Sequence, residues 1–78
     1  MSEEYLYEYR QILKNTLNQV DALIYEIENF STQSATIVPT EIRFDAVPIV
    51  RRLKEAKKLT EESLFINKKR LQRSSEYL

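Results

Sequence analysis

Apolar residues recur at every seventh position through the first third of the chain. One column consists of Leu6, Leu13, Val20 and Ile27. A second column, three residues further on, consists of Tyr9, Thr16, Leu23 and Phe30. This repeat predicts an amphipathic helix over about residues 3–30. The flanking apolar residues Tyr5, Ile12, Leu17 and Ile24 make the stripe wider than contact with a single neighbouring helix requires.

The last third of the chain predicts a second helix, over about residues 46–76. Asp45 is a favourable N-cap, and Pro48 would then lie in the first turn, where its missing N–H costs nothing. One face of this helix would carry Ile49, Val50, Leu53, Ala56, Thr60, Leu64, Leu71 and Leu78. Because each helix has an apolar face, we predict that the two pack antiparallel as a helical hairpin.

The segment between the helices lacks their periodicity. Polar residues from Ser31 onwards compete for backbone hydrogen bonds, and Pro39 disfavours a helical conformation for Val38. We therefore expect a loop over residues 31–44, with Phe44 as an apolar anchor against the helix ends. The chain is predicted to form one domain, residues 1–78.

Several apolar residues of the second helix do not fit its main face. Exposed apolar groups often mark a contact surface, and pairing with another hairpin would bury them in a four-helix bundle. The predicted fold is all-α, with two long antiparallel helices that complete such a bundle by dimerisation or by binding a helical partner. The predicted partner-binding residues are Leu59, Phe65, Ile66 and Tyr77 of the second helix and Ile12, Leu17 and Ile24 of the first.

The composition argues against catalysis and cofactor binding. The chain contains no Gly, Cys or His, so it lacks glycine-rich nucleotide loops, disulfides and the usual ligands of zinc, haem and iron–sulfur clusters. We therefore expect no enzymatic activity, no cofactor and no metal. With only 78 residues, the chain buries a small core, which favours stabilisation by a second protein molecule.

Charge divides the chain into two halves. Residues 1–45 carry three basic and eight acidic side chains, a net charge of −5, whereas residues 46–78 carry nine basic and four acidic ones, a net charge of +5. An acidic helix beside a basic one, within the chain or between chains, explains this division. The main functional prediction is a non-enzymatic protein–protein interaction module: a small adaptor, regulator or chaperone-like hairpin.

A nucleic-acid-binding regulator is the alternative prediction. Its candidate contacts are Arg51, Lys54, Lys58, Lys69 and Arg73 of the second helix, since basic side chains neutralise phosphates. The same helix contains oppositely charged pairs four residues apart, which are typical of an exposed helix surface. The sequence has no apolar run of membrane-spanning length and no signal-peptide pattern at its start, so we expect a cytoplasmic protein without a membrane partner.

Overall fold

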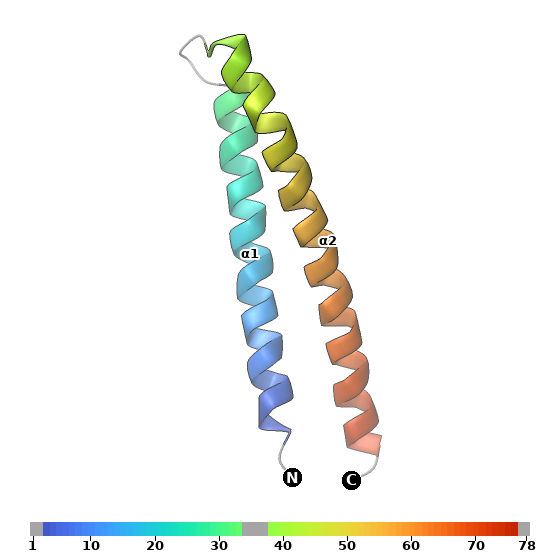
Figure 1. The fold of residues 1–78 in the computed structure, drawn as a ribbon. Coiled ribbons are helices and arrows are strands. Elements are labelled where there is room, and N and C mark those ends of the chain that lie inside the picture. The colour runs from blue at the N-terminus through green and yellow to red at the C-terminus, as the bar shows by residue number, and fades with distance from the viewer. Residues whose placement is uncertain (1–2, 34–37, 77–78) are drawn as a thin grey trace.

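Two long helices lie side by side and antiparallel in the computed structural model, which describes residues 3–33 and 38–76 (Figure 1). Helix α1 spans Glu4–Gln33 and helix α2 spans Thr40–Glu76. The molecule measures 59 × 17 × 15 Å, and its two termini lie at the same end. The all-α prediction is confirmed, and there is no strand in the part of the chain that the structure describes.

Helix α1 continues three residues beyond its predicted end. The Ser31 hydroxyl donates to the carbonyl oxygen of Ile27 at 2.9 Å, and the Thr32 hydroxyl donates to that of Glu28 at 2.6 Å. These side chains bond back onto the preceding turn instead of breaking the helix. At the other end, the Glu3 carbonyl oxygen accepts from the Leu6 amide at 2.9 Å.

Helix α2 begins six residues before the predicted start. The Pro39 carbonyl oxygen accepts hydrogen bonds from the Ile42 and Arg43 amides, at 3.1 and 3.2 Å. Proline suits a helix start because its φ angle is already helical and the first amides need no partner within the helix. The loop predicted over residues 31–44 is therefore wrong at both ends, since residues 31–33 and 40–44 are helical.

Two consequences of this earlier start correct the sequence-based picture. Phe44 lies within α2 and is 68% exposed, so it does not anchor the connection. Pro48 lies in the helix interior, where it removes the amide that would bond to the Phe44 carbonyl group. Asp45 is likewise an interior helical residue and not an N-cap.

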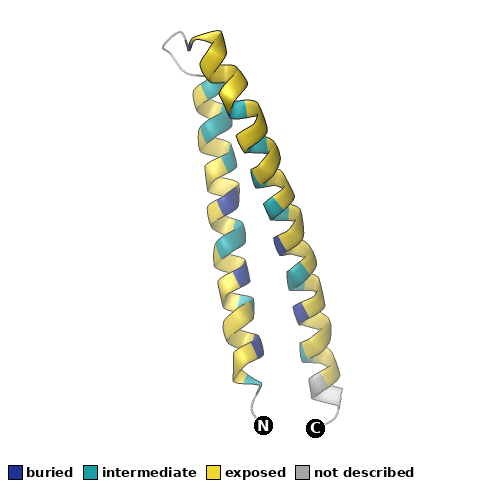
Figure 2. Ribbon diagram, viewed as in Figure 1, coloured by how far each residue is buried: buried dark blue, intermediate teal, exposed yellow. Residues whose placement is uncertain are grey.

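The contact between the helices, here called the seam, follows a strict spacing of alternately three and four residues along α1. Leu6, Leu13 and Val20 are buried, and Ile27 is half-buried, which confirms the first predicted column. The column that completes the seam lies four residues further on and consists of Arg10, Leu17, Ile24 and Ser31, all half-buried. Figure 2 shows buried and half-buried positions along the facing sides of the two helices.

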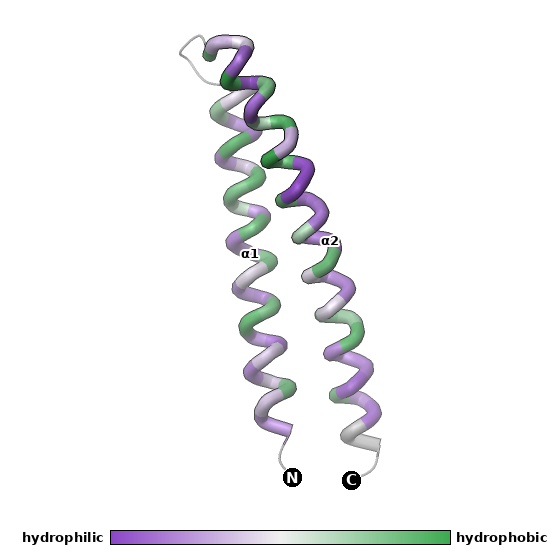
Figure 3. The backbone as a smooth tube through the Cα atoms, viewed as in Figure 1, coloured by the Kyte–Doolittle hydropathy of each residue, from purple (hydrophilic) through white to green (hydrophobic). Residues whose placement is uncertain are grey.

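The second predicted column of α1 flanks the seam and does not form the contact with α2. Tyr9, Leu23 and Phe30 are 42%, 46% and 56% exposed. They lie beside the seam instead of inside it, because α2 packs on the other flank of the first column. Figure 3 shows that apolar stretches recur along both helices and are not gathered at one end.

Helix α2 contributes a more polar side of the seam. Its seam positions are Ala46, Val50, Leu53, Lys57, Thr60, Leu64, Asn67 and Leu71. Asn67 is only 1% exposed, and its Nδ2 donates to the Leu6 carbonyl oxygen at 3.1 Å. The Thr60 hydroxyl donates to the Ala56 carbonyl oxygen at 2.8 Å. Ile49, predicted to belong to this face, is 48% exposed.

Candidate interaction surface

Two ion pairs between the helices define one edge of the hairpin. Lys57 Nζ lies 2.8 Å from Asp21 Oδ1, and Lys54 Nζ lies 3.2 Å from Glu28 Oε1. The hydrogen bond and the charge of Asp21 raise the pKa of Lys57 above its usual value of 10.5. Acidic α1 residues thus meet basic α2 residues within the chain. We call this side the ion-paired edge.

The helical repeat shows which residues lie on the side of the seam opposite the ion-paired edge. Asp21 and Glu28 of α1 and Lys54 of α2 each directly follow a seam residue. Successive residues are about 100° apart around a helix, so residues that precede a seam position lie on its other side. Because the following positions of both helices share the ion-paired edge, the preceding positions of both helices share the opposite one.

That opposite edge carries large exposed apolar residues on both helices, separated by polar ones such as Gln19, Glu26, Arg52 and Arg70. The large apolar residues are 42–64% exposed, and we call them the apolar edge: Tyr5, Tyr9, Ile12, Leu23 and Phe30 of α1 and Ile42, Ile49, Leu59 and Ile66 of α2. Exposed apolar groups are ordinary when scattered singly, whereas several of them gathered on one side of a molecule are typical of a contact surface.

The structure divides the predicted partner-binding residues between two environments. Ile12, Leu59 and Ile66 lie on the apolar edge and are 59%, 64% and 48% exposed. Leu17 and Ile24 are half-buried in the seam, where they contact α2. The sequence analysis assigned Tyr9, Leu23 and Phe30 to the apolar stripe of α1 and did not name them as partner-binding residues. The signal available was the competing column four residues beyond Leu6.

Phe65 belongs to neither group, although it lines a shallow depression together with Ile66. It is 59% exposed on the outer side of α2, and the Lys69 ammonium lies over its ring, 4.6 Å from the centroid. Such a contact stabilises an exposed helix by about 0.5–1 kcal/mol. Tyr77 falls outside the described residues.

Two of the predicted nucleic-acid-binding residues already have partners within the chain. Lys54 is paired with Glu28 on the ion-paired edge, and Lys69 lies over Phe65. The others are exposed, and at about 100° per residue the whole set lies within a strip roughly 100° wide on α2: Arg51, Lys54, Lys58, Lys69 and Arg73.

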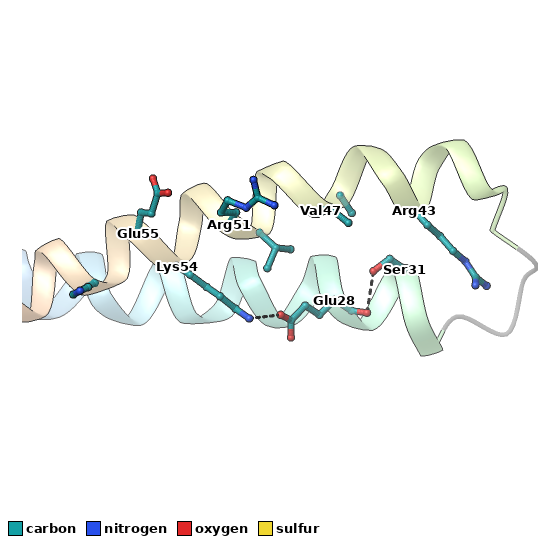
Figure 4. A pocket seen from close by; sticks show the side chains of 10 residues that line it. Glu28, Ser31, Arg43, Val47, Arg51, Lys54 and Glu55 are labelled. Carbon is teal, nitrogen blue, oxygen red and sulfur yellow. Dashed lines mark hydrogen bonds and ion pairs between the residues drawn. The ribbon is translucent and has the colours of Figure 1, made fainter.

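A shallow groove of about 600 Å³ lies on the ion-paired edge near the connection (Figure 4). Its apolar part is made by Ala46, Val47 and Val50, and its rim carries both signs of charge: Glu28, Arg43, Arg51, Lys54, Glu55 and Lys58. Figure 4 shows Lys54 reaching across to Glu28 at the side of this groove. The mixed rim provides no strong preference for an anionic or a cationic ligand.

Searches for other kinds of site and for relatives gave negative results. Within residues 3–33 and 38–76, no three acidic side chains are grouped so as to hold a metal ion. Neither helix, over its described length, is apolar enough to cross a membrane. Comparison of the chain with protein families, with curated proteins and with solved structures found no match.

Proposed function

We propose that this chain is a non-enzymatic protein–protein interaction module that packs its apolar edge against the helices of another protein molecule. The observation that supports the proposal is a set of exposed apolar pairs outside the seam, each with a spacing of seven residues. They are Tyr5 and Ile12, Leu23 and Phe30, Ile42 and Ile49, and Leu59 and Ile66. Residues seven apart lie on the same face of a helix, two turns apart, so each pair presents an apolar face to a neighbouring molecule.

The size of the apolar edge matches the energy that association needs. Full burial of a large apolar side chain contributes about 1.5–3 kcal/mol. Association costs roughly 4–15 kcal/mol in lost translational and rotational freedom. These nine side chains, each already 36–58% covered within the hairpin, retain enough exposed area for an interface of moderate affinity. The structure offers no comparable support for a nucleic-acid-binding role, because two of the five candidate cations already have partners.

Site-specific photo-cross-linking in the cells that produce the protein tests this proposal. A photoreactive phenylalanine derivative replaces Leu23 on the apolar edge or, as the matched control, Tyr25 on the outer side of α1. The two residues are 46% and 70% exposed and about 200° apart around one helix. We expect adducts with protein from position 23 and none from position 25.

Equal labelling from the two positions, or no adduct from either, would contradict the proposal. The control residue Tyr25 is the more exposed of the two. Greater accessibility therefore cannot explain adducts that form only from position 23. The mass of any adduct then reports whether the neighbour is a second copy of this chain or a different protein.

A further inference from the structure

The hairpin exposes more surface than a compact monomer of its mass. Its accessible surface is 6523 Å², whereas a folded monomer of 9.3 kDa exposes about 5000 Å². The surplus of roughly 1500 Å² exceeds the ~800 Å² that each partner contributes to a standard interface. A stable dimer therefore has ample area to bury.

The apolar edge extends over both helices, which lie side by side along the 59 Å length of the molecule. A single helix would fill the groove between them and leave the outer members of each strip uncovered. Another antiparallel pair with the same seven-residue spacing covers both strips at once. A second copy of this chain is such a pair.

We infer that a second copy of this chain covers the apolar edge in a four-helix bundle, an inference that rests on the proposed function. The two-fold axis of this bundle runs parallel to the helices. In this arrangement α1 of one copy lies beside α2 of the other, and both connections lie at the same end. Every helix then has antiparallel neighbours. The symmetry allows no sliding of one copy along the other, so it fixes which residues meet.

The ion pair at the middle of the hairpin shows which residues of α1 and α2 lie at the same level along the helix axes. Asp21 and Lys57 lie side by side, and both helices rise about 1.5 Å per residue in opposite directions. A residue of α1 is therefore level with the residue of α2 whose number brings their sum to about 78. Under a two-fold axis parallel to the helices, the same relation holds between α1 and the α2 of the copy.

Applied to the apolar edge, this relation brings like residues together at two places. Ile12 is level with Ile66 of the copy, and Phe30 is level with Ile49 of the copy. Leu23 lies at the level of the small side chain of Ala56. Two large apolar groups of α1, Ile12 and Phe30, thus meet isoleucines of the copy. The same relation places Tyr5, Tyr9 and Leu59 beside polar or charged residues: Arg73, Lys69 and Gln19.

Charges on the same edge also match. Glu26 of α1 is level with Arg52 of α2, and by the helical repeat both flank the seam on the apolar side. Helix α1 carries five acidic and two basic residues, and α2 carries ten basic and six acidic ones. Placing α1 beside the copy's α2 therefore pairs a net charge of −3 with one of +4.

The other two-fold arrangement is less favourable in charge. An axis perpendicular to the helices places α1 against α1 and α2 against α2, with the connections at opposite ends. Like net charges then face each other, and Arg52, Arg70 and Arg73 of α2 approach the same residues of the copy. The shift that places Tyr5 opposite Phe30 on α1 places Leu59 near the copy's Glu62 on α2, about four residues from Ile66.

Sedimentation equilibrium of the purified chain over a dilution series tests the inference. We expect an average mass near twice the 9.3 kDa of the chain, falling on dilution. Ile66→Asp should weaken dimerisation at least ~100-fold, because each dimer buries two copies of the changed side chain. Phe65→Asp is the matched control: Phe65 is 59% exposed but on the outer side of α2, so this change should leave the dimer intact.

The orientation has its own test. The chain has no cysteine, so Thr40→Cys carries a single spin label next to the connection. Connections at the same end give a distance between labels of about 20–30 Å, since neighbouring axes in a bundle are ~10 Å apart. Connections at opposite ends give a distance approaching the 59 Å length of the hairpin, and that result would overturn the parallel axis.

A monomeric mass at every concentration would overturn the inference, as would a dimer that Ile66→Asp and Phe65→Asp weaken equally. Circular dichroism of both variants separates loss of the dimer from loss of the helices. A monomeric purified chain that nevertheless forms adducts from position 23 in cells would refute the second copy and leave the interaction module standing. Absence of both would refute the proposed function as well.

Discussion

Replacing Asn67 with Leu tests how the seam is stabilised. Asn67 is the most buried residue of the hairpin, at 1% exposure. Its Nδ2 donates to the Leu6 carbonyl oxygen at 3.1 Å, but its Oδ1 is buried without a hydrogen-bond partner among the described residues. We expect Asn67→Leu to stabilise the protein.

The expected magnitude follows from four contributions. Removing the unpaired oxygen relieves about 1–3 kcal/mol, and the lost hydrogen bond to Leu6 costs about 0.5–1.5 kcal/mol. Burying the leucine side chain contributes about 1.5–3 kcal/mol, while fitting its larger volume costs about 1–3 kcal/mol. The Leu6 carbonyl group retains its helical bond within α1. The net gain is about 1 kcal/mol.

Thermal and urea unfolding followed by circular dichroism measure this gain. For a domain of this size, 1 kcal/mol raises the midpoint temperature by about 4–8 °C. Protein concentration must be equal for all variants, because self-association shifts the midpoint. Asn67→Asp is the control of similar size: it places a carboxylate at the buried site opposite the Leu6 carbonyl group and should destabilise the protein strongly.

A lower midpoint for Asn67→Leu would refute this reasoning. It would mean that Oδ1 is hydrogen-bonded in solution, so that the amide is a net stabilising group. An unchanged midpoint temperature would mean that fitting the larger leucine side chain costs about 3 kcal/mol, the upper end of the range given above. The experiment therefore distinguishes an amide that sets the register of the helices at a cost in stability from one that stabilises them.

Three further predictions concern the ion pair, the start of α2 and the core. Replacing Lys57 with Met should lower the midpoint at pH 7, and the difference from the wild type should disappear as the pH rises through the pKa of Lys57. That pKa lies above 10.5, and a raised lysine pKa stabilises the fold only while the group is charged. Pro48→Ala should raise stability by roughly 1–3 kcal/mol, because it restores an interior helical amide, and Asp45→Ala should change it by less than about 0.5 kcal/mol. A loss of about 1 kcal/mol from Asp45→Ala would instead indicate an N-cap there. Leu13→Ala removes one of the few buried side chains, 8% exposed, and should cost about 2–4 kcal/mol in urea unfolding; a smaller loss than that would place Leu13 outside the core.

The helix starts show where the sequence interpretation was misled. Asp45 and Pro48 resemble the start of a helix, and the absence of periodicity before them suggested a long loop. Local signals could not show that Pro39 begins the helix instead, because both prolines are compatible with a first turn. The longer α2 is consistent with the burial of Val38, at 7% exposure, beside its first turn.

The interaction surface was only partly predictable. Ile12, Leu59 and Ile66 could be identified because they did not fit the predicted faces, and the structure leaves them exposed. Phe30 could not, because an apolar residue in a heptad column is ordinarily a core residue. The burial of Asn67 was also beyond sequence reasoning, since an asparagine within a helix is usually exposed.

The sequence by itself determined the two helices and the column of Leu6, Leu13, Val20 and Ile27 at the seam. It did so because these residues have no Gly or interior Pro among them and keep a repeat of seven. The tertiary structure alone decided which flank of that column α2 covers. Apolar residues occur on both flanks, so hydrophobicity does not choose between them. The structure places α2 on the flank where Lys57 and Lys54 reach Asp21 and Glu28, which leaves the other flank exposed.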